Sequence, residues 1–132
     1  MVAHSVFVPR PVAVGRRLLI VQREPVSARA LARFMRPYFS HVDIAASPSE
    51  ADAILDAGGT ETDVVCGERF GPEEQRGTRW LADLRARRSA IRRVVLTTSE
   101  VVDPRRPGVD AVFPKPFDPV ELATYLTREP PR

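Results

Sequence analysis

The chain has 132 residues, of which 43% are hydrophobic and 28% are charged, values typical of one globular domain with a full core. No apolar run reaches the roughly 18 residues that a membrane-spanning helix requires, so we expect no transmembrane helix. The net charge is only +3, and the densest basic stretch, RARRSAIRR at residues 85–93, contains no aromatic side chain. We therefore expect neither nucleic-acid nor membrane binding.

The N-terminal stretch MVAHSVFVPRPVAVGRR lacks the pattern of a signal peptide. Cys66 is the single cysteine and cannot form an internal disulfide, which fits a reducing compartment. We expect a cytoplasmic protein. The two histidines do not have the spacing of metal ligands, and we expect no metal and no cofactor.

Residues 1–15 contain two prolines and no clear periodicity, and we expect an N-terminal extension there. The apolar run RLLIVQ at 17–22 predicts a strand buried on both faces. Residues 27–36 place apolar side chains on one helical face and predict a helix. A shorter, more exposed strand is expected at 41–46.

The segment SPSEADAILDAGG, residues 47–59, contains the clearest helix signals of the chain. Ser47 is a suitable N-cap, Pro48 suits the first helical position, and Glu50 completes a capping box. The run TDVVCG at 62–67 then predicts a third strand.

The second half continues the same alternation. We expect a helix at 78–88 with its apolar residues inward, a strand at 92–98 and a short strand at 110–113. Asp118 and Pro119 repeat the cap and first-turn proline, and they begin a last helix.

Alternating strands and helices with short loops indicate an α/β domain with a parallel sheet covered on both faces. We place this domain at residues 16–128 and treat 129–132 as a C-terminal tail. Too few residues separate Thr98 from Gly108 for a full crossover helix, and the sequence DPRRP disfavours one. The helix between the fourth and fifth strands is therefore predicted to be shortened or missing.

In such a sheet the C-terminal ends of the strands meet at one crevice, where ligands usually bind. The sequence places six polar side chains there: Gln22, Arg23, Glu24, Glu68, Thr97 and Lys115. Lys115 is the only lysine of the chain, and it is followed by proline in the stretch PKPF. A compact ammonium group is thus expected to have a role in the crevice.

Over residues 16–127 this arrangement resembles the receiver domain of bacterial response regulators. The best local match is GVDAVFPKPFDPVELATYL, residues 108–126, which is similar to the usual end of that family. Pro72 stands four residues after the position of the family's phosphoacceptor, and TDVVCGE resembles the strand that leads to it. The resemblance implies a CheY-like, flavodoxin-like doubly wound fold with five parallel strands, and a role in two-component signal transduction.

The departures from the family predict a degenerate pseudo-receiver. The family has an acidic cluster after the first strand, where this chain has Gln22 and Arg23. The family has a phosphoacceptor aspartate after the third strand, where this chain has Glu68. A positive charge stands where a divalent cation would bind. We expect that Arg23 takes the electrostatic place of the metal, that Glu68 lies between Arg23 and Lys115, and that no phosphorylation or other catalysis occurs.

The resemblance then implies a bacterial protein-interaction module. The family's aromatic switch position falls at Val112, with Phe113 beside it. We expect a docking surface around the shortened crossover, and its candidate residues are Arg105, Arg106, Val112, Phe113 and Pro114. The expected partners are other signalling proteins or a second copy of this chain. The sequence does not determine whether the crevice resembles the active or the inactive receiver state.

Two alternatives stay open at this point. A divergent receiver would still accept phosphate within a phosphorelay and would use Glu24 for the metal. A small α/β domain would instead bind an anion or a nucleotide through Arg23 and Lys115, although QREPVSAR lacks the glycines of a phosphate-binding loop.

Overall fold

The computed structural model describes residues 16–59, 61–103 and 105–128. The expected N-terminal extension at 1–15 and the tail at 129–132 lie outside these described residues, and the domain limits stay a prediction. The strands are β1 (Arg17–Val21), β2 (His41–Ala45), β3 (Thr62–Cys66), β4 (Ile91–Thr98) and β5 (Ala111–Pro114). The helices are α1 (Pro25–Met35), the short 3-10 helix η1 (Arg36–Tyr38), α2 (Pro48–Asp56), α3 (Gly77–Ala82), α4 (Leu84–Arg87) and α5 (Pro119–Thr127).

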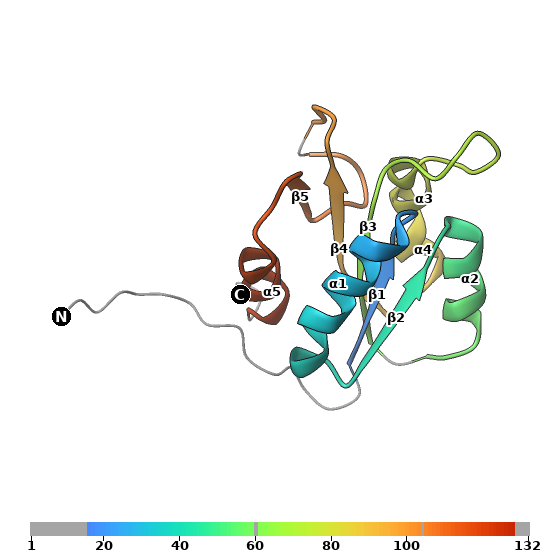
Figure 1. Ribbon diagram of the computed structural model, residues 1–132. Helices are drawn as coiled ribbons and strands as arrows, with labels where there is room; N and C mark the ends of the chain where they lie inside the picture. The colour runs from blue at the N-terminus through green and yellow to red at the C-terminus, as the bar shows by residue number, and fades with distance from the viewer. Residues whose placement is uncertain (1–15, 60, 104, 129–132) are drawn as a thin grey trace.

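The strands form one parallel sheet in the order β2-β1-β3-β4-β5. Helices α1 and α5 cover one face of the sheet, and α2, α3 and α4 cover the other (Figure 1). The predicted doubly wound, flavodoxin-like architecture is confirmed. No helix in the described part of the chain is long and apolar enough to cross a membrane.

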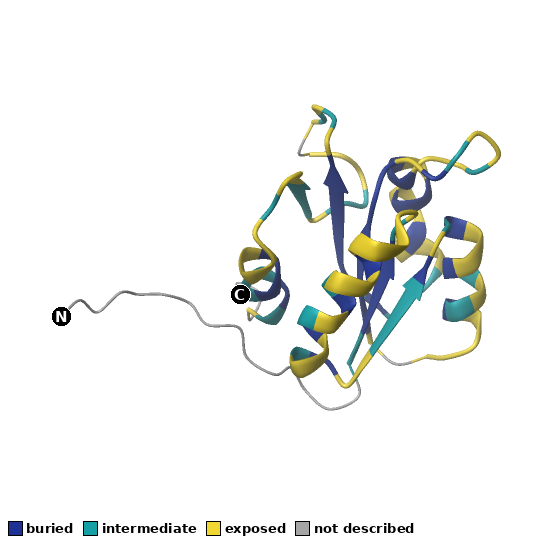
Figure 2. Cartoon of the chain, in the orientation of Figure 1, coloured by how far each residue is buried: buried dark blue, intermediate teal, exposed yellow. Residues whose placement is uncertain are grey.

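Two apolar cores lie on opposite faces of the sheet. The three central strands are buried almost throughout, whereas β2 and β5 are half-exposed (Figure 2). Trp80, Leu81 and Leu84 fill the core beneath α2, α3 and α4, as the sequence predicts. Cys66 lies in the same core, and burial raises the pKa of its thiol well above the usual range, with a smaller effect from the nearby Glu68 charge. The cysteine is therefore a packing residue.

Side-chain caps begin helices α2 and α5. Ser47 caps α2 by accepting from the Glu50 N–H at 3.2 Å, and Glu50 in return accepts from the Ala46 N–H at 3.1 Å. Asp118 caps α5 through the Val120 N–H at 2.8 Å. Both predicted caps are confirmed.

Two predicted helix boundaries are wrong. Helix α1 begins at Pro25, two residues earlier than expected, because Glu24 acts as its N-cap. The single helix expected at 78–88 is interrupted at Asp83, whose φ of −118° is outside the helical range, so α3 and α4 are separate short helices.

Arg93 connects β4 to the end of α5. Its side chain crosses the Tyr125 ring at 5.2 Å from the centroid and donates to the backbone carbonyl oxygens of Tyr125 and Arg128. Burial lowers the pKa of this guanidinium, and the neighbouring Arg92 lowers it further. At the same end of the sheet, Asp63 is buried against Arg16, and desolvation raises its pKa although the arginine opposes the shift. The Arg93 contacts hold the end of α5 against the sheet.

The predicted loss of a crossover helix between β4 and β5 is confirmed, since residues 99–103 and 105–110 contain no helix. This short connection packs directly against the C-terminal end of α3. Gly108 has a φ of +76°, and a Cβ atom there would lie 2.4 Å from the Leu81 carbonyl oxygen and 2.8 Å from that of Ala82. Only glycine permits both the backbone conformation and the close approach.

We predict that Gly108→Ala destabilises the domain by about 2 kcal/mol or more, because the methyl group meets two backbone carbonyl oxygens and the φ angle is strained. Urea unfolding measures the change. Gly59→Ala is the matched control, since no atom lies within 4 Å of its Cβ position. Equal stability of the two variants would contradict the proposed packing of the crossover.

Candidate functional site

The candidate site lies at the C-terminal edge of the sheet, where the strand order reverses between β1 and β3. Val21 pairs with Cys66, so Gln22 and Gly67 are neighbours directly beyond the two strands. The Gln22 side chain lies over Gly67, and its Oε1 would be 2.4 Å from a Cβ atom at that position. Crevices at such reversals are the usual ligand sites of open α/β sheets.

All six predicted crevice residues line two adjoining cavities at this edge. Gln22, Glu68, Thr97 and Lys115 line a cavity of about 140 Å³. Gln22 and Lys115 also line a second cavity of about 390 Å³, and its wall includes Arg23 and Glu24. The backbone of Lys115 is held at this edge because its amide N–H donates to the Thr98 carbonyl oxygen at 2.9 Å.

Glu68 is a buried carboxylate with three hydrogen bonds, and only 5% of its side chain is exposed. Its Oε1 accepts from the Thr78 N–H at 2.8 Å. Its Oε2 accepts from the Thr78 hydroxyl at 3.2 Å and from Arg76 Nη1 at 3.2 Å. Both oxygens of the carboxylate thus accept hydrogen bonds from its own connecting loop and the first turn of α3.

The expected ion pairs of Glu68 with Arg23 and Lys115 are not formed, and this expectation is corrected. Within the described ranges, the cation that contacts Glu68 is Arg76. The physical reason is local. The Gly77 N–H donates to the Glu68 carbonyl oxygen at 2.9 Å, which brings the Arg76–Thr78 segment alongside Glu68. A Cβ atom on Gly77 would overlap the Gly67 carbonyl oxygen at 1.8 Å, so only glycine allows this approach.

Arg76 also connects this loop to the end of β4. Its Nη1 lies 3.3 Å from a Glu100 carboxylate oxygen, and Arg69 Nε lies 2.7 Å from the same carboxylate. Contact with Arg69, and then with Arg76, lowers the pKa of Glu100, while the hydrogen bond to Glu68 raises that of Arg76. Two carboxylates and two guanidinium groups therefore balance each other's charge. We call Glu68, Arg69, Arg76, Thr78 and Glu100 the Glu68 network.

The Glu24 side chain caps the N-terminus of α1. Its carboxylate accepts from the Val26 N–H at 2.6 Å and from the Ser27 N–H at 3.3 Å, which is its role as N-cap of α1. In the described residues, no three His, Cys, Asp or Glu side chains are grouped to hold a metal ion. Magnesium prefers carboxylate oxygens, so Gln22, Arg23 and the two engaged glutamates do not fit such an ion.

The candidate docking residues lie in β5 and in the crossover that precedes it. Val112 packs against the core on the α2 and α3 face, beside Val102 and Val109 of the crossover. Phe113 packs on the opposite face, with ring centroids 6.0 Å from Phe117 and 5.8 Å from Tyr125. The other three candidates, Arg105, Arg106 and Pro114, are exposed at the crossover and the end of β5.

Sequence reasoning missed four of the five members of the Glu68 network: Arg69, Arg76, Thr78 and Glu100. A signal for Glu100 existed, since it is an acid two residues after the end of a buried strand. Arg76 and Thr78 carried no comparable signal, because their role depends on a loop that turns back over its own start.

No family model and no curated protein matches the sequence significantly. A CheY-like response regulator receiver domain from Methanospirillum hungatei matches with 21% identity and a TM-score of 0.69, over 86% of this chain and 91% of that one. The response regulator TrrA from Thermotoga maritima, solved with Mg²⁺–BeF, matches with 20% identity and a TM-score of 0.68, over 84% and 96%.

A chain from the CheX–CheY–BeF₃–Mg²⁺ complex of Borrelia burgdorferi matches with 17% identity and a TM-score of 0.69, over 86% of this chain and 87% of that one. The chain has the CheY-like receiver fold. Identities at this level establish the fold alone. The assignment of a function to the receiver-like edge of the sheet must therefore rest on the crevice residues themselves.

We predict that Glu68→Gln lowers the free energy of unfolding by about 1–3 kcal/mol, because a neutral amide cannot replace the buried carboxylate that accepts from Thr78 and Arg76. Chemical denaturation checks this value. Glu73→Gln is the control in the same loop, because Glu73 is exposed, and its change should stay within about 0.5 kcal/mol. Similar losses in both variants would show that the network does not stabilise the loop.

Proposed function

We propose that the protein is a receiver-like module for protein–protein interaction whose state does not depend on phosphorylation. The observation that carries this proposal is the bonding of Glu68, the residue at the position of the receiver phosphoacceptor. Its carboxylate oxygens accept three hydrogen bonds, one of them from a guanidinium group. Both oxygens are thereby engaged, and phosphoryl transfer to either would first have to break these contacts.

The charges around the crevice support the same conclusion. Phosphoryl transfer in receivers requires a divalent cation held by carboxylates to neutralise the incoming group. At the end of β1 this chain has Arg23, and Glu24 is used as a helix cap. The Glu68 network supplies its own positive charge from Arg76 and Arg69. The Glu68 carboxylate is neutralised without phosphate or metal, and we propose that the loop carrying it is held in one state.

We propose further that other signalling proteins bind the face around the crossover. Arg105 and Arg106 are exposed within the β4–β5 connection that lacks a helix, and Pro114 is exposed at the end of β5. The solved CheX–CheY complex supports a binding role for domains of this fold. Charge reversal at Arg105 and Arg106 together should lower the affinity for an identified partner protein. Charge reversal at Arg29 and Arg33 on α1 should leave that affinity unchanged. Equal affinities of the two double variants would exclude this face.

The proposal predicts that the protein gains no phosphoryl group when it is incubated with acetyl phosphate and Mg²⁺. Intact-mass spectrometry is the direct measurement, with an active receiver domain treated in parallel as the positive control. Trp80 supplies a second readout, since its indole N–H donates to Asp52 at 3.1 Å in the core beneath the crevice. Its fluorescence should not respond to Mg²⁺.

A mass gain in the wild-type protein that is absent from Glu68→Gln would overturn the proposal and assign a working phosphoreceiver. A mass gain that persists in that variant would place the modification at another residue and leave the bonding of Glu68 as described.

A further inference from the structure

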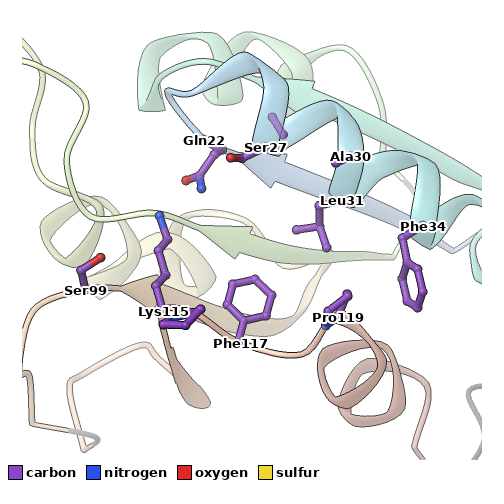
Figure 3. Close-up of a pocket in the computed structure, with 11 residues that line it drawn as sticks. Gln22, Ser27, Ala30, Leu31, Phe34, Ser99, Lys115, Phe117 and Pro119 are labelled. Carbon is purple, nitrogen blue, oxygen red and sulfur yellow. The ribbon is translucent and has the colours of Figure 1, made fainter.

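A groove of about 620 Å³ lies between α1 and α5 and opens at the crevice (Figure 3). One of its walls comes from α1, and the other comes from the segment between β5 and α5 together with the first residue of α5. This volume is within the usual range of small-molecule sites and has room for a ligand of about 10–20 non-hydrogen atoms.

One end of the groove is polar. Figure 3 shows Gln22, Ser99 and Lys115 gathered there, and Ser27 lies beside them on α1. Among the described residues that line the groove, Lys115 carries the only charge. Within the described part of the chain its ammonium group makes no ion pair, and the side chains of Gln22, Ser27 and Ser99 form no hydrogen bonds. Four polar groups thus converge on one space and are available to a ligand.

The rest of the groove is apolar. Leu31 and Phe34 from α1 face Phe117 and Pro119 across it (Figure 3). Leu31, Phe34 and Phe117 are half-buried, so part of their apolar surface is left uncovered by the protein. The Phe117 ring is held at its edge by Phe113, at a centroid distance of 6.0 Å. The wall that it forms is therefore positioned before any ligand arrives.

We propose that this groove binds a small organic carboxylate with a flat apolar body. The carboxylate would contact the Lys115 ammonium group and accept hydrogen bonds from Ser27, Ser99 or Gln22, while the apolar body lies between Leu31 and Phe117. One ammonium group matches a singly charged head, and no carboxylate in the lining opposes it. A neutral apolar molecule would leave the polar end unused. Binding of this kind needs no phosphoryl chemistry, so it stands whether or not Glu68 accepts phosphate.

The test is a titration of the ¹⁵N-labelled full chain with 1-naphthylacetate, followed by ¹H–¹⁵N NMR spectra. We expect saturable shifts at the amides of Ala30, Leu31 and Phe117. The neutral analogue 2-(1-naphthyl)ethanol should bind about tenfold more weakly than the carboxylate. Lys115→Met should lower the affinity for the carboxylate by a similar factor. Lys115→Arg keeps the charge, and Arg33→Met removes an exposed cation of α1 that does not line the groove. Both controls should retain most of the affinity.

A second variant tests the apolar part of the groove independently of the Lys115 charge. Ala30→Trp fills the apolar part while Lys115 stays in place, and it should abolish the titration. The proposal is overturned if the acid and the alcohol bind equally, or if no saturable shift appears at millimolar carboxylate.

Discussion

The Glu68 carboxylate accepts three hydrogen bonds at a place where only 5% of its side chain reaches solvent. Burial of a charge is costly unless that charge is paired and bonded, so the surrounding chain has to deliver donors to it. Thr78 provides a backbone and a hydroxyl donor, and Arg76 provides the opposite charge. The course of the loop between β3 and α3 follows from this requirement.

The same requirement extends to the next strand. Arg76 is half-exposed and also contacts Glu100, which in turn pairs with Arg69. An isolated surface pair contributes little, but here a buried carboxylate anchors one end of the chain of contacts. The connections that follow β3 and β4 are thereby joined at the edge where receivers carry out their chemistry. On the far side of α3, the shortened crossover packs through Gly108 against the carbonyl groups that end the helix. Both loops are held by contacts within the chain.

Much of the fold follows from local sequence patterns. Continuous apolar runs located the buried strands, and Ser47 and Asp118 marked two helix starts through their capping geometry. The gathering of Gln22, Glu68, Thr97 and Lys115 also followed, because parallel strand ends must share an edge. What failed were features that depend on contacts between loops. The predicted partner of Glu68 is wrong because Arg76 comes next to Glu68 only when Gly77 packs closely against the backbone of Gly67 and Glu68. The cap role of Glu24 was missed because a glutamate followed by proline was interpreted as part of the crevice.

The amide of Thr78 reports the central interaction most directly, because it donates to Glu68. The decisive measurement is the ¹H–¹⁵N resonance of Thr78 during addition of Mg²⁺ and beryllium fluoride, a phosphoryl mimic. If the Glu68 carboxylate is permanently engaged, this resonance stays in place in the wild-type protein and moves in Glu68→Gln without any addition. A saturable shift of the Thr78 amide in the wild-type protein would show that Glu68 is released to bind metal and phosphoryl mimic, and it would contradict the account.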